Sequence, residues 1–105
     1  MRIPAFMYRF LAALLGILRI GAARASLDFA SLSAGLQAAL TITVTGAKVG
    51  DYVLWGVSAA LDTGISITAY VSAADTVTLI AVNNTAGAVD PVAATYNVTV
   101  LRRLA

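Results

Sequence analysis

The chain has 105 residues, which is enough for one domain and a tail but excludes a second catalytic domain. Hydrophobic residues make up 60% of the chain, so the chain is not disordered. Charged residues make up only 11%, so we expect some of the apolar surface to contact a partner. Cys and His are both absent, which excludes disulfides, thiolate nucleophiles, imidazole bases and the usual zinc ligands, and with them most classes of enzyme.

The charges are distributed unevenly along the chain. Residues 1–25 contain four basic residues and no acidic one, namely Arg2, Arg9, Arg19 and Arg24. Residues 26–105 contain all five aspartates and only three basic residues, so this part is net acidic. We therefore expect an N-terminal segment, 1–25, and a β domain, 26–105. Nucleic-acid binding is not predicted, because the positive net charge belongs to the N-terminal segment alone.

Residues 5–20 are predicted to form an amphipathic α-helix. Pro4 suits a first helical turn, the following residues are rich in Ala and Leu, and Gly21 stands where a left-handed helix cap is favoured. Four apolar residues recur at the 4-3-4 spacing of a helix-bundle seam, and the arginines project to the opposite side. The predicted assembly or anchor interface consists of Met7, Arg9, Leu11, Leu14 and Leu18.

Three alternatives to a docking or bundling helix are open for residues 1–25. A secretory signal peptide is suggested by the basic start, the apolar run and residues 23–25, which have the form of an A-x-A cleavage site. A membrane span is weaker, because the uninterrupted apolar run between Arg9 and Arg19 is nine residues long and a span needs about 20. The third alternative is a helix that covers one face of the β domain. We favour a helix that bundles with its own copies or docks on an assembly.

From Leu36 onward the hydrophobic periodicity changes to two residues, which is typical of β-strands. The predicted strands are residues 40–45, 52–57, 65–71, 77–82 and 95–101, with a shorter one at 27–29. The strand at 52–57 is apolar on both faces, so we expect it to be buried on two sides. Trp55 and Tyr52 are then core residues rather than a sugar-stacking platform. The fold class predicted is all-β, a small antiparallel β-sandwich or barrel preceded by the N-terminal helix.

Three apolar residues, Ile80, Val82 and Leu101, lie on the faces opposite the main apolar sets of their strands. A body of this size buries only about 60–65% of its chain surface on its own, and no disulfide or metal compensates. We therefore expect these side chains to contact other copies of the chain.

The aspartates are predicted to serve turns rather than an active site. Four of them lie beside turn residues, namely Asp51, Asp62, Asp75 and Asp90. A carboxylate pair for glycoside hydrolysis and an oxygen-ligated calcium site built from these aspartates are the minor alternatives. Residues 83–85 and 97–99 match the N-glycosylation acceptor pattern, which is common by chance. We predict no catalytic residue, no cofactor and no metal site.

A series of turns and strand ends follows from residue 41 onward. It comprises Val44-Thr45-Gly46-Ala47 leading to Val49-Gly50-Asp51, then residues 71–77 (VSAADTV), residues 84–88 (NTAGA) with Asp90-Pro91, and a closing V-x-V at residues 98–100. This combined string resembles a short β domain of virion proteins from tailed bacteriophages, among them capsid decoration (cement) and head-fibre proteins. The resemblance implies a non-enzymatic homotrimer at the capsid surface that binds the major capsid protein or neighbouring virion proteins.

Two functions from different classes fit these sequence features. The leading one is a capsid decoration or head-fibre protein, whose N-terminal helices attach or bundle and whose β domains form an exposed knob. The alternative is a secreted or cell-surface adhesion module in which residues 1–25 are a signal peptide. We do not expect a membrane partner for the leading function, because the predicted helix is too short in apolar length to span a bilayer.

Overall fold

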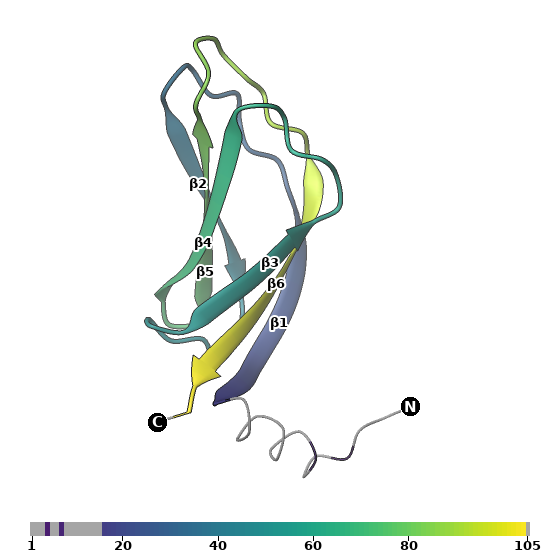
Figure 1. Cartoon of the computed structure of the whole chain (residues 1–105), viewed down its shortest axis with the longest axis vertical. Helices are drawn as coiled ribbons and strands as arrows, with labels where there is room; N and C mark the ends of the chain where they lie inside the picture. The colour runs from purple at the N-terminus through teal and green to yellow at the C-terminus, as the bar shows by residue number, and fades with distance from the viewer. Residues whose placement is uncertain (1–3, 5–6, 8–15, 105) are drawn as a thin grey trace.

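The structure is a computed structural model that describes residues 4, 7 and 16–104, and it contains six β-strands (Figure 1). The strands are β1 (Ile17–Leu27), β2 (Gln37–Thr43), β3 (Tyr52–Val57), β4 (Ile65–Ala73), β5 (Thr76–Asn83) and β6 (Ala94–Arg103). They form two antiparallel three-stranded sheets, which we call the β6 sheet (order β1-β6-β3) and the β5 sheet (order β2-β5-β4). The predicted all-β antiparallel fold is confirmed.

The chain crosses between the sheets at every connection except that between β4 and β5, which form a hairpin. Asp75 lies in the tight turn of this hairpin with a φ of 61°, in the left-handed region that Asp tolerates better than most residues. Its carboxylate accepts the Gly46 N–H at 2.8 Å, and its own N–H donates to the Ala47 carbonyl oxygen at 2.9 Å. The hairpin tip therefore holds the loop that follows β2.

Inward-facing side chains of both sheets form the core. The central strands β6 and β5 contribute its fully buried centre, namely Tyr96, Val98, Val100, Val77, Leu79 and Ala81. Phe29, just after β1, meets the Tyr96 ring edge to face with centroids 6.1 Å apart. Trp55 of β3 lies against the same ring at 6.2 Å and is half-buried. The prediction of a core residue is confirmed for Trp55 but wrong for Tyr52, which is 49% exposed.

Residues 17–20 form part of β1, so the helix predicted for residues 5–20 is wrong at its C-terminal end. From Gly21 onward, alternate residues of β1 face the core and the sheet's outer surface, and the strand pairs with β6 along its length. Gly21 is not a left-handed helix cap. A Cβ placed there would lie 3.2 Å from a methyl carbon of Val44, so the glycine serves close packing.

The rest of the predicted helix lies outside the described residues, apart from Met7 and Gly16. The Met7 N–H donates to the Pro4 carbonyl oxygen at 3.0 Å. The proposed boundary between residues 25 and 26 falls inside β1, which continues to Leu27. The folded sandwich therefore includes residues that the sequence analysis assigned to the N-terminal segment.

β3 is an edge strand, so the prediction that it is buried on two sides is wrong. Its outward residues Tyr52 and Leu54 are 49% and 61% exposed, whereas Val53, Trp55 and Val57 face the core. The apolar composition of both faces suggested a central strand, but β6 occupies the centre of this sheet and no described residues form a layer over the outer side of β3.

Candidate interaction surface

The predicted assembly interface is only partly within the described residues. Met7 is 39% exposed. Leu18 is 37% exposed and lies in β1 opposite Arg102 of β6, so it does not continue a helical seam. Arg9, Leu11 and Leu14 lie outside the described residues, and the role of these five residues in assembly stays a prediction.

The outer face of the β6 sheet carries three exposed arginines, Arg19, Arg24 and Arg103. We call this the basic face, and its outward positions are Ile17, Arg19, Ala22, Arg24, Ser26, Thr95, Asn97, Thr99, Leu101, Arg103, Tyr52, Leu54 and Gly56. The register places Leu101 between Arg19 and Tyr52, and Asn97 between Arg24 and Gly56. None of these outward positions is acidic. The pairing of β1 with β6 therefore collects cations from both ends of the sequence on one surface.

The outer face of the β5 sheet differs from the basic face in charge. Its outward positions are uncharged and mostly small or hydroxylated, namely Gln37, Ala39, Thr41, Thr43, Ser66, Thr68, Tyr70, Thr76, Thr78, Ile80 and Val82. The Ser72 and Thr78 hydroxyls share a hydrogen bond of 2.6 Å on this side. Ile80 and Val82 lie here as predicted, and both are half-buried.

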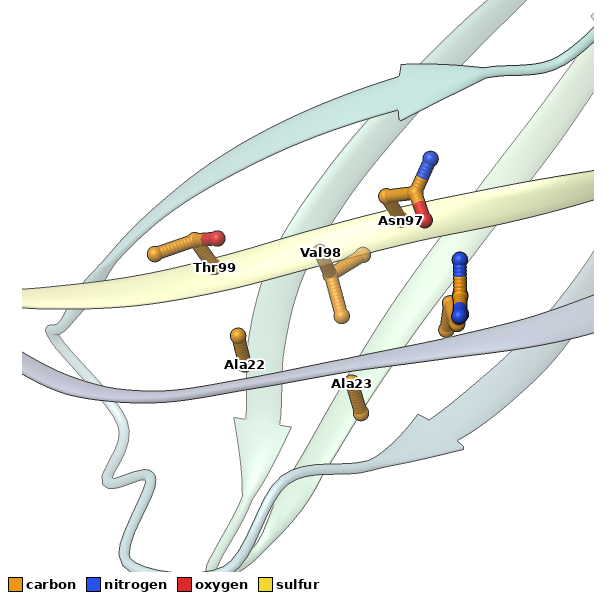
Figure 2. Close-up of a pocket in the computed structure, with 6 residues that line it drawn as sticks. Ala22, Ala23, Asn97, Val98 and Thr99 are labelled. Carbon is orange, nitrogen blue, oxygen red and sulfur yellow. The ribbon is translucent and has the colours of Figure 1, made fainter. Parts of the chain in front are cut away.

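A shallow hollow of about 370 Å³ lies where β1 meets β6, and it is lined by Ala22, Ala23, Arg24, Asn97, Val98 and Thr99 (Figure 2). Ala22 lies opposite Thr99 and Arg24 lies opposite Asn97 in the strand register. A guanidinium, a carboxamide and a hydroxyl all donate hydrogen bonds. The hollow is therefore suited to binding acceptor-rich groups such as carboxylates.

Three of the aspartates hold turns, as predicted. Asp75 binds the loop after β2, as described above, and Asp62 accepts the Val92 N–H at 2.8 Å. Asp51 accepts the Lys48 N–H at 2.9 Å and two hydrogen bonds from Arg102, at 2.8 Å from Nε and 2.7 Å from Nη2. These carboxylates therefore have partners within the chain.

The Asp51–Arg102 ion pair closes the end of the sandwich near the start of β3. The Asp51 side chain is 5% exposed, and the hydrogen bonds from Arg102 hold its pKa below the ordinary 3.8, with the Lys48 N–H acting in the same direction and burial opposing both. Arg102 also donates to the Gly46 carbonyl oxygen at 3.1 Å. This arginine is thus committed to the fold and does not belong to the basic face.

Asn83 is fully buried, and its side chain makes four hydrogen bonds. Its Nδ2 donates to the carbonyl oxygens of Leu32 (2.9 Å) and Gly87 (2.8 Å). Its Oδ1 accepts from the N–H (2.9 Å) and the hydroxyl (2.7 Å) of Thr85. A glycan on Asn83 is incompatible with this folded structure, whereas Asn97 is exposed on the basic face.

The structure gives little support to the minor alternatives, which are a sugar-stacking platform, a metal site and a membrane span. Tyr52 and Trp55 lie on opposite faces of β3, so they do not form one stacking platform. Within the described part of the chain, no group of three or more His, Cys, Asp or Glu side chains gathers where a metal ion could bind. Residues 4, 7 and 16–104 also include no helix with the length and apolar character to cross a bilayer.

No protein-family model, curated protein or solved structure matches the chain at a significant level. The function is therefore argued from the chemistry of the surface itself. The basic face offers cations, hydrogen-bond donors and two exposed apolar side chains, Tyr52 and Leu54, on a sheet whose strands fix their positions.

Proposed function

We propose that this chain is a non-enzymatic structural protein of a tailed-bacteriophage particle, a capsid decoration (cement) or head-fibre protein that binds the capsid surface. The observation that carries the proposal is the basic face, where Arg19, Arg24 and Arg103 share one sheet surface with no carboxylate among its outward positions. The resemblance of residues 41–101 to virion β domains supports the same class.

The chemistry of the basic face defines the partner that it fits. Arginine pairs with carboxylates through planar, two-pronged hydrogen bonds, so an acidic protein surface complements this face. Each exposed ion pair contributes only about 0.2–1 kcal/mol, so one copy binds weakly. A homotrimer, the assembly that the resemblance implies, would present the face three times and gain through effective concentration. The major capsid protein, or a virion protein beside it, is the proposed partner.

The alternative adhesion function requires removal of residues 1–25 as a signal peptide, and β1 argues against it. Cleavage after Ala25 would remove all of β1 except Ser26 and Leu27. β6, whose side chains Tyr96, Val98 and Val100 face the core, would then lose the strand that pairs with one of its edges. Since these three side chains are part of the core, the mature chain would lose part of its fold rather than a dispensable leader.

The test uses a phage that encodes this chain. Heads are purified from the parent phage and from a strain lacking the coding sequence, and bound protein is quantified by mass spectrometry. We expect the chain on parent heads, with residues 17–25 of β1 retained, and we expect it to bind again when added to the deficient heads. Absence of the chain from parent heads, or a mature chain that begins at Ser26, would contradict the proposal.

A further inference from the structure

The free edge of β3 exposes backbone groups that have no partner within the described part of the chain. Ser58 donates its N–H to the Thr95 carbonyl oxygen at 3.0 Å and so continues the ladder between β3 and β6. In an antiparallel ladder the residues alternate in the side to which their N–H and C=O groups point. Tyr52, Leu54 and Gly56 therefore bond to β6, and the backbone groups of Val53, Trp55 and Val57 point away from it.

This edge lacks the features by which proteins protect exposed strands. Edge strands are usually blocked by charge, proline or a bulge. β1 has two exposed arginines and a bulge between Arg19 and Gly21, and β4 has a bulge between Val71 and Ala73. The β3 sequence, YVLWGV, contains no charge and no proline, and its register with β6 is regular. β3 is therefore competent to accept another strand.

A second copy of β3 complements this edge when the two strands run antiparallel with Trp55 opposite Trp55. Val53 then lies opposite Val57 of the other copy. The backbone groups of Val53, Trp55 and Val57, which point away from β6, all find hydrogen-bonding partners in the other strand. Such pairs exchange two N–H···O bonds each. A two-fold axis relates the copies, so the contact is closed and the same surface is used on both sides.

The side chains fit this register on both faces of the strand. On the outer face Leu54, 61% exposed, lies opposite Gly56 of the other copy, and a Cβ at Gly56 would have nothing within 4 Å. The large side chain therefore has space to occupy. On the inner face Val53, Trp55 and Val57, which are only half-buried, meet their counterparts. These pairs are apolar, and none brings like charges together.

We propose that β3 is a self-association site through which two copies of the chain join their β6 sheets into one continuous six-stranded sheet. This contact is two-fold, so it predicts pairs of copies where the resemblance implied threefold assembly. The proposal concerns the isolated chain and holds whatever particle the chain attaches to.

The experiment measures the mass of the purified full chain by sedimentation velocity over a range of concentrations. The expected result is a reversible monomer–dimer equilibrium. Leu54→Lys should raise the dissociation constant at least tenfold, because each lysine replaces an apolar contact at the edge. Val49→Lys is the matched control, since Val49 is 70% exposed in the preceding turn and outside β3. It should leave the dissociation constant within about twofold.

Two further variants separate pairing from folding. Gly56→Val adds a side chain where the single copy has open space and suits a strand, so it should keep the circular dichroism of the fold while blocking Leu54 of the other copy. Adding Gly56→Glu to Leu54→Lys places opposite charges across the two-fold axis and should restore at least part of the lost association. Amide exchange at Val53, Trp55 and Val57 should slow as the protein concentration rises.

Several results would overturn the proposal. These are a monomer at every concentration, or a dimer or trimer whose stability is unchanged by both Leu54→Lys and Gly56→Val. Concentration-independent exchange at the three edge amides would also overturn it.

Discussion

Asn83 and Asp51 are polar side chains that hold separate loops to the strands. Asn83 connects the segment after β1 with the turn after β5, and Asp51 connects the turn before β3 with Arg102 at the end of β6. From the sequence we assigned Asp51 to a turn. The burial of Asn83 and the pairing of Asp51 with Arg102 were not predictable, because both depend on segments far away in the sequence.

Replacing Asn83 with Ala should destabilise the fold by about 2–4 kcal/mol, because its buried side chain makes four hydrogen bonds, to Leu32, Thr85 and Gly87, that Ala cannot make. Asn97→Ala removes the same amide from an exposed position and should change the unfolding free energy by less than about 0.5 kcal/mol. Urea denaturation measures both variants. Equal effects would mean that the Asn83 network does not stabilise the protein.

The stability of the protein should fall on acidification partly through Asp51. Because Arg102 lowers the pKa of Asp51 below 3.8 in the folded state, the unfolded state binds the proton more readily. The stabilisation is therefore complete above pH 3.8 and is lost as the pH falls through the folded-state pKa. Asp51→Asn should be less stable than the native chain near neutral pH, and the difference should shrink below about pH 4. The unfolding free energies of both chains are measured by urea denaturation at each pH. A difference between them that stays constant down to pH 2 would contradict this assignment.

At the scale of elements, alternation of apolar and polar residues predicted β2, β4, β5 and β6 with small errors at their ends. β1 was missed because Ala, Leu and Arg favour helices in isolation, whereas pairing with β6 decides the structure of residues 17–20. β3 was predicted as a strand but placed in the wrong environment. A strand that is apolar on both faces suits the centre of a sheet, and sequence did not show that β6 occupies that place.

A chain that begins at Ser26 should fail to fold, since it lacks the partner of β6 along most of its length. A chain that begins at Gly16 keeps β1 and the bond from the Leu104 N–H to the Gly16 carbonyl oxygen, and it should retain the native β-type circular dichroism and cooperative melting. The β domain that the sequence predicted at residues 26–105 therefore lacks a strand that we expect it to need for folding. A cooperative melt for the Ser26 chain at the native temperature would show that β1 is dispensable.

At the scale of the whole molecule, the charges are segregated by the fold. The excess of arginine near the N-terminus was visible in the sequence, but a helical interpretation placed Arg19 and Arg24 opposite an apolar seam. The pairing of β1 with β6 instead puts them on the same sheet face as Arg103, while Asp51, Asp62 and Asp75 serve the loops. The basic face was therefore not predictable without the strand register.

The most direct test of the proposed function is the binding of the purified chain to heads that lack it, measured as occupancy against salt concentration. We predict that occupancy falls as salt rises, and that the double variant Arg19→Ala/Arg24→Ala binds at least tenfold more weakly with a smaller salt dependence. Lys48→Ala, which removes an exposed charge from a turn outside the basic face, should bind like the native chain. Native occupancy and salt dependence in the double arginine variant would contradict the claim that the basic face holds the chain on the particle.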